Sequence, residues 1–126
     1  MQLAAEGKVR GSVLDVGCGT GENAMFFAGI GLEVLGVDTS PAAIEKAKKK
    51  APSLKKSKAS FTVADALHLE TLGRKFDTIT DSGLFHTFSD DDRVLFERSL
   101  RSALRIGSIY FVLCFSDKEP ARWGRP

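Results

Sequence analysis

A glycine-spaced segment near the start of the sequence most constrains what this chain can fold into. The apolar run at residues 13–16 has the length of a buried strand, and apolar residues recur at helical spacing over residues 24–28. Between them stand Gly17, Gly19 and Gly21. A strand, a glycine turn and a helix bring backbone close to a nucleotide-like ligand, because glycine has no Cβ to obstruct it. The segment therefore predicts a ligand-binding turn.

Glu22 stands where a dinucleotide-binding fingerprint has its third glycine. A carboxylate at a helix N-terminus repels a pyrophosphate, which prefers bare backbone N–H groups. A ligand with hydroxyls, an ammonium or a sulfonium meets no such repulsion. A nicotinamide dinucleotide oxidoreductase is therefore a disfavoured alternative.

Strand and helix patterns alternate along the rest of the chain. We expect strands at residues 12–16, 33–37, 60–64, 76–80 and 109–115, and a short helix or turn at 66–69. We expect longer helices from cap Thr20 to Gly29 or Gly31, over 41–50 after cap Ser40, and from cap Ser89 to Gly107. This alternation predicts an α/β fold with a mostly parallel sheet and helices on both faces.

Acidic residues follow three of the predicted strands. Asp38, Asp65 and Asp81 each stand at a carboxyl end, the edge where ligands bind in sheets of this kind. Unpaired charges add nothing to a core, so these acids predict a site. Structural alternatives are an Asx turn ahead of Ser40 for Asp38, and a cap on the following helix for Asp65.

The segment Leu14-Asp15-Val16-Gly17-Cys18-Gly19-Thr20-Gly21 resembles motif I of the class I S-adenosylmethionine (SAM)-dependent methyltransferases. The resemblance implies a doubly wound, Rossmann-like sheet with strand order 3-2-1-4-5. It also implies SAM as cofactor and a methyl transfer by in-line displacement. Because the cofactor is already activated, the protein mainly has to align the reactants and exclude water.

The resemblance also assigns roles to single residues. It implies that Asp15 helps hold the methionine ammonium group, although Asp15 could instead satisfy amides of the glycine loop. Asp38 is expected to accept from the ribose hydroxyls, Asp65 from the adenine amino group, and Ala66 to offer its backbone N–H to the ring. The predicted cofactor-binding residues are Asp15, Gly17, Cys18, Gly19, Gly21, Asn23, Asp38, Thr39, Asp65, Ala66 and Asp81.

Asp81 and His86 are the candidate catalytic residues. A thiolate acceptor needs only alignment, whereas a hydroxyl acceptor also needs a base, and both residues lie where the family places the sulfonium and the acceptor. A histidine among phenylalanines is more often a packed residue than a base. The two cysteines, Cys18 and Cys114, fit no metal-ligand spacing, so we expect free thiols and no metal site.

The segment after the fourth predicted strand narrows the class of methyl acceptor. It has no Asn/Asp-Pro-Pro-aromatic run and no Pro-Cys, which the family uses on amines, amides and cytosine C5. Residues 81–89 and 114–117 are most similar to small-molecule enzymes of the thiopurine, thiol and tellurite-resistance type. The sequence predicts a SAM-dependent methyltransferase with a small-molecule acceptor; the alternative is a non-catalytic SAM- or nucleoside-binding domain or fragment.

Length and charge bound the remaining options. The 126 residues suffice for one domain, and a net charge of +2 gives no strong attraction to nucleic acid or membrane. Lysines 46–58 lack interleaved aromatic residues, so we interpret them as a solvated face rather than an RNA site. We expect a cytoplasmic protein that binds neither nucleic acid nor membranes.

The resemblance ends after the fifth strand, whereas the family fold has strands six and seven beside it. Residues 104–108 also depart from the family's Leu-Lys/Arg-Pro-Gly-Gly turn. An apolar fifth strand at an open edge invites pairing. We therefore expect residues 1–126 to be one SAM-binding domain, truncated at its C-terminus, or a homodimer joined through that edge.

Overall fold

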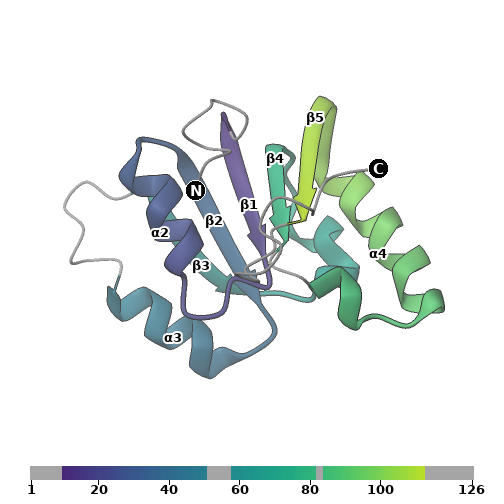
Figure 1. Ribbon diagram of the computed structural model, residues 1–126, viewed down its shortest axis with the longest axis horizontal. Helices are drawn as coiled ribbons and strands as arrows, with labels where there is room; N and C mark the ends of the chain where they lie inside the picture. Colours follow the sequence, from purple (N-terminus) through teal and green to yellow (C-terminus); the bar gives the residue numbers. More distant parts are fainter. Residues whose placement is uncertain (1–9, 51–57, 82–83, 113–126) are drawn as a thin grey trace, which may run out of the picture.

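The computed structural model describes residues 10–50, 58–81 and 84–112. Its sheet has five strands in the order β3-β2-β1-β4-β5, and every neighbouring pair is parallel (Figure 1). The strands are β1 (Ser12–Val16), β2 (Glu33–Asp38), β3 (Ala59–Val63), β4 (Phe76–Asp81) and β5 (Leu104–Val112). The predicted parallel α/β sheet and its strand order are confirmed. Of the strand predicted at 109–115, residues 113–115 lie outside the described part.

Helices cover both faces of the sheet. Figure 1 shows α2 (Glu22–Gly29) and α3 (Pro41–Lys50) on one side and α4 (Asp90–Ala103) on the other. The 3₁₀ helix η2 (Ala66–Leu72) packs beside α4, and a second, η3 (Leu84–Thr87), follows β4. Val13 belongs to the core under α2 and α3, and its neighbour Leu14 to the core under α4 and η2. Alternation along β1 thus supplies both cores, as a sheet covered on two faces requires.

Two of the three predicted helix caps are confirmed. The Ser40 hydroxyl accepts from the backbone of Ala43 at 3.1 Å, and that of Ser89 from Asp92 at 3.2 Å. The prediction for Thr20 is wrong: Gly21 holds the cap position of α2 with a φ of 91°, and no side chain of a described residue caps that end. The turn out of β1 needs left-handed backbone there, which glycine adopts at low cost.

The predicted end of the last helix at Gly107 is also wrong. Helix α4 ends at Ala103, and Leu104 begins β5 by pairing with Phe76 of β4. Leu104 packs against the core below α4, which favours the earlier end. Pairing is irregular until Ile109 meets Thr78, and Gly107, with a φ of 84°, lies in this stretch.

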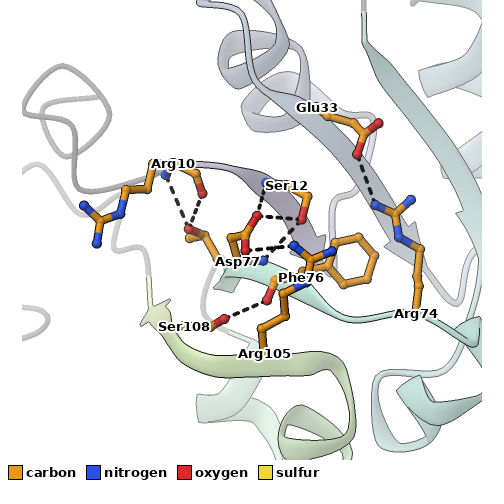
Figure 2. A network of polar contacts seen from close by, with 9 residues as sticks. Arg10, Ser12, Glu33, Arg74, Phe76, Asp77, Arg105 and Ser108 are labelled. Atoms are coloured by element: carbon orange, nitrogen blue, oxygen red, sulfur yellow. Dashed lines mark hydrogen bonds and ion pairs between the residues drawn. The ribbon is translucent and has the colours of Figure 1, made fainter.

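A polar network joins β1, β4 and β5 at the amino end of the sheet. Figure 2 shows Asp77 between Ser12 and Arg105. The Asp77 carboxylate accepts from the Ser12 backbone at 2.9 Å and from the Arg105 guanidinium at 3.0 Å. Arg74 stacks 4.4 Å above the ring of Phe76 and pairs with Glu33 of β2 (Figure 2). Among the described residues, no helix combines the length and apolar character needed to cross a membrane.

Candidate functional site

The carboxyl ends of the strands meet at one edge, because Val16 of β1 is in register with Val37 of β2 and with Asp81 of β4. A cavity of about 150 Å³ opens there. Its walls come from segments far apart in the sequence and are apolar apart from two carboxylates and one hydroxyl. The lining residues are Val16, Gly17, Val37, Asp38, Thr39, Ala64, Asp65, Ala66, Leu84 and Phe88.

Five of the predicted cofactor-binding residues line this one cavity: Gly17, Asp38, Thr39, Asp65 and Ala66. The structure therefore brings together residues that the sequence places on three different strand ends. Asp15 and Asp81 are fully buried and are not among the described lining residues. Asn23 lies half-buried in the first turn of α2. The side chain of His86 lies outside the described part of the chain, so its catalytic role stays a prediction.

The glycine loop is built from left-handed backbone, with φ values of 70° at Gly17, 57° at Gly19 and 91° at Gly21. A Cβ added at Gly19 would meet nothing within 4 Å, so its backbone faces open space. A Cβ at Gly21 would lie 2.8 Å from the ring of Phe61, in the core. Gly19 thus leaves room for a ligand, whereas Gly21 makes room for the packing of β3 against α2.

Asp38 ties the glycine loop to the end of β2. Its carboxylate accepts from the backbone N–H of Gly19 at 2.9 Å through one oxygen, and from that of Ser40 at 2.9 Å through the other. The Asx turn to Ser40 is therefore present. A carboxylate has about four acceptor positions, so these two bonds leave capacity for the hydroxyls of a ligand.

Asp65 caps η2, since its carboxylate accepts from the backbone of Leu67 at 2.9 Å while the side chain remains exposed at the cavity. The following turn is held from α4 by Ser99, a buried residue. Its hydroxyl donates to the carbonyl of Ala66 at 2.6 Å and accepts from the backbone of Leu69 at 2.8 Å. Ser99 thereby fixes the cavity wall that Ala66 forms.

Asp15 is a buried acid with one unsatisfied oxygen. The hydroxyl of Thr80, opposite it on β4, donates to Oδ1 at 2.8 Å, and buried Oδ2 has no hydrogen-bond partner among the described residues. Burial raises the pKa of Asp15 to about 7; the Thr80 bond opposes this rise, and the charges of Asp81 and Asp38 add to it. An orphaned buried oxygen has a large desolvation cost, which a nearby cation would offset.

Cys18 behaves as a small apolar residue. It is buried in the core under α2 and α3, and burial, with the charges of Asp15 and Asp38 adding to it, raises its thiol pKa to about 12. A thiol with such a pKa is not a nucleophile at neutral pH. Its backbone N–H donates to the carbonyl of Val37 at 2.9 Å, which holds the glycine loop against β2. Among the described residues, no group of three potential metal-ligating side chains is present.

Asp81 accepts two hydrogen bonds from different segments. The backbone N–H of Leu84 donates to Oδ1 at 2.7 Å, and the Tyr110 hydroxyl donates to Oδ2 at 2.9 Å. Sequence reasoning missed Tyr110 and Ser99, as well as the apolar walls Leu84 and Phe88. Only Phe88 carried a signal, being an aromatic residue just before a capped helix; the Tyr110 contact depends on the register of β4 and β5, and those of Ser99 and Leu84 on how α4 and η3 pack.

The carboxylate oxygens at this edge suit a cationic ligand that carries hydroxyl groups. The acceptor capacity of Asp38 and the buried Oδ2 of Asp15, which has no partner among the described residues, favour hydrogen-bond donors and positive charge over a phosphate, and the open space at Gly19 leaves room for a ligand. SAM has a sulfonium, an ammonium and a ribose diol, so the residues present fit it.

Comparisons with known proteins agree with this chemistry. The family described as "Methyltransferase domain" matches residues 13–107. An uncharacterized methyltransferase of Schizosaccharomyces pombe is 35% identical over 125 residues, 99% of this chain and 86% of the relative. The 2-heptyl-1-hydroxyquinolin-4(1H)-one methyltransferase of Mycobacteroides abscessus is 36% identical over 115 residues, 91% of this chain and 51% of the relative.

A solved structure from work on the conversion of a disulfide bond into a thioacetal group in echinomycin biosynthesis is 45% identical, with a TM-score of 0.84. The match covers 92% of this chain and 47% of that one, so the chain spans about half of these last two proteins. Motif, sheet order, cavity and family match agree: the chain belongs to the class I methyltransferases, whose methyl donor is SAM.

Proposed function

We propose that the cavity at the carboxyl ends of the strands holds SAM for methyl transfer to a small-molecule acceptor. The observation that carries this proposal is the convergence of Gly17, Asp38, Asp65 and Ala66 on one cavity. When bound, SAM supplies a methyl group on a positively charged sulfur, a reactive centre that needs no further activation.

The residues divide the cofactor between them in this proposal. Asp38 accepts from the ribose hydroxyls, while Asp65 and the backbone of Ala66 bind the adenine. Gly17 and Gly19 admit the methionine part. Asp15, fully buried and with no partner for Oδ2 in the described part of the chain, balances the ammonium group of the methionine. Thr39 lies next to Asp38 in the cavity wall.

An acceptor that ionises on its own suits the described walls best. The titratable side chains among the lining residues are Asp38 and Asp65, and both are assigned to the cofactor. No base is therefore left in the described lining for an ordinary alcohol. The similar solved structure comes from work on a disulfide bond, and the similar Mycobacteroides abscessus protein is named for a substrate with an N-hydroxyl group. We therefore propose a thiol or a similarly acidic hydroxyl as the acceptor.

Calorimetric titration of the full chain with SAM tests the cofactor site. We expect binding, and in D38N a loss of about ten- to a hundredfold in affinity, the usual effect of removing hydrogen bonds to a charged group. E97Q is the matched control, because Glu97 lies exposed on α4 and pairs with Arg101. Equal affinity in D38N and wild type would contradict the assignment of Asp38.

A methyl-transfer assay with benzyl mercaptan and benzyl alcohol then tests the acceptor class. The two probes share their shape and differ in the acidity of the nucleophile. We expect methylation of the thiol and little of the alcohol. SAM binding without transfer to either probe would favour the alternative, a non-catalytic SAM-binding domain.

The outer edge of β5 bears on self-association. Among the described strands β5 is the last one on its side of the sheet, and Ile106 and Ile109 are exposed on it. We propose that a second copy covers this edge, giving a homodimer. Sedimentation of a monomer at high protein concentration would contradict this.

A further inference from the structure

The carboxylate of Asp81 connects two segments that are distant in the sequence. It stands at the end of β4, is fully buried, and receives the Leu84 backbone N–H on Oδ1 and the Tyr110 hydroxyl on Oδ2. The donor–acceptor distances are 2.7 and 2.9 Å, within the normal range of hydrogen bonds. Asp81 is therefore held from β5 and itself holds the first residue of η3.

Strand register explains how Tyr110 reaches Asp81. Ile79 is opposite Tyr110 in the parallel pair of β4 and β5, and Asp81 lies two residues further along β4. Alternation puts Ile79, Asp81 and Tyr110 on one face, and a tyrosine spans the diagonal to the next position. The Tyr110 ring meets Phe96 of α4 edge-to-face, with ring centroids 6.1 Å apart.

The segment held in this way forms one wall of the cavity. Leu84 lines it and approaches the glycine loop so closely that a Cβ on Gly17 would lie 3.4 Å from Leu84 Cδ2. Phe88, just after η3, lines the same cavity and packs edge-to-face on Phe96 at 5.1 Å. Both ends of the wall are therefore attached to the Phe96–Tyr110 pair, one through an aromatic contact and one through Asp81.

This geometry gives Asp81 a different task from proton transfer. A base needs a carboxylate oxygen directed at the acceptor. Here the buried side chain already accepts from two protein donors, and Leu84, not Asp81, is among the lining residues. Burial, with the neighbouring charge of Asp81 adding to it, raises the pKa of Tyr110, so the phenol remains a neutral donor.

We propose that Tyr110 is a positioning residue for methyl transfer: it fixes Asp81, which fixes the Leu84–Phe88 wall against the glycine loop. The inference rests on the proposed function, in which SAM occupies the cavity that Leu84 and Phe88 line. Alignment of reacting atoms is most of what this chemistry requires, so a displaced wall slows the transfer step.

The first test measures hydrogen exchange at the amide of Leu84 in the full chain. Y110F removes the hydroxyl and keeps the ring on Phe96. We expect exchange at Leu84 to accelerate about tenfold or more, because Asp81 loses the donor that fixes it. T78V is the matched control. Thr78 is buried in β4, the strand of Asp81, and its hydroxyl donates to the Arg10 carbonyl at the other end of the sheet.

The second test compares binding with turnover, using SAM and benzyl mercaptan as probes. In Y110F we expect kcat to fall about ten- to a hundredfold, while SAM affinity changes less than about threefold because Asp38 and Asp65 are untouched. Equal acceleration at Leu84 in Y110F and T78V, or an unchanged kcat in Y110F, would overturn the inference. Absence of SAM binding in the wild type would instead refute the proposed function, and the exchange comparison would still decide the contact.

Discussion

At the scale of single residues, the burial of Asp15 makes stability depend on pH. Its pKa is about 7 in the folded protein, against an ordinary value of 3.8. Between about pH 4 and pH 7, the folded state therefore keeps a proton on Asp15 that the unfolded state has lost. The stability contributed by this carboxyl is complete below about pH 4 and declines as pH rises to about 7, by at most about 4 kcal/mol.

We predict that D15N removes this decline. Asparagine carries no charge, so its burial cost is the same at every pH. Urea unfolding between pH 4 and 8 should show the free energy of unfolding falling in the wild type and nearly level in D15N. Asp77 behaves in the opposite way. Hydrogen bonds lower its pKa, the largest effect coming from the Ser12 backbone N–H, so the stability that Asp77 contributes is lost as pH falls. The same slope in D15N and wild type would contradict the prediction.

Gly19 and Gly21 of the three-glycine loop should respond differently to alanine. G21A forces the Cβ to within 2.8 Å of the Phe61 ring at a φ of 91°, so we predict a loss of about 3 kcal/mol or more. G19A meets open space and bears only the left-handed strain, about 1 kcal/mol. Urea unfolding measures both. SAM affinity should nevertheless fall in G19A, because the methyl group takes ligand space; equal stability of the two variants would refute the distinction.

At the scale of elements, Ser99 links α4 to η2. S99A leaves the buried backbone of Ala66 and Leu69 without that partner, so we predict a loss of about 1–3 kcal/mol in unfolding free energy. S102A is the matched control, since the Ser102 hydroxyl donates to the Ser99 carbonyl within the same helix. Urea unfolding should show a clearly smaller loss in S102A. Similar losses would mean that the link between the elements contributes little.

The sequence predicts elements well where local pattern and packing agree. The glycine turn, caps Ser40 and Ser89 and the acids at the strand ends all have local signals. The parallel sheet follows from the alternation of strands and helices, whereas its strand order was implied by the resemblance to the methyltransferase family. Gly107 looked like a helix end, but Leu104 gains more by packing below α4 as the first residue of β5. Contacts such as that of Tyr110 with Asp81 depend on the register between strands, which no local pattern encodes.

At the scale of the whole molecule, the two ends of the sheet have separate tasks. The Asp77 network holds β1, β4 and β5 together at the amino end, away from the cavity at the carboxyl end (Figure 2). We predict that D77A lowers the free energy of unfolding but leaves the SAM affinity of the folded protein within about twofold of the wild type. Calorimetry below the unfolding transition measures this. A much larger change would show that the two ends are coupled.

The acids gathered at the cavity end have a consequence for exchange of the methyl donor. Asp38, Asp65 and Asp81 together attract an approaching cation, and SAM carries a net positive charge that its demethylated product lacks. The negative potential of these acids should therefore raise the association rate of SAM and have little effect on that of the demethylated product. In stopped-flow experiments, added salt should slow association of SAM and leave that of the product almost unchanged.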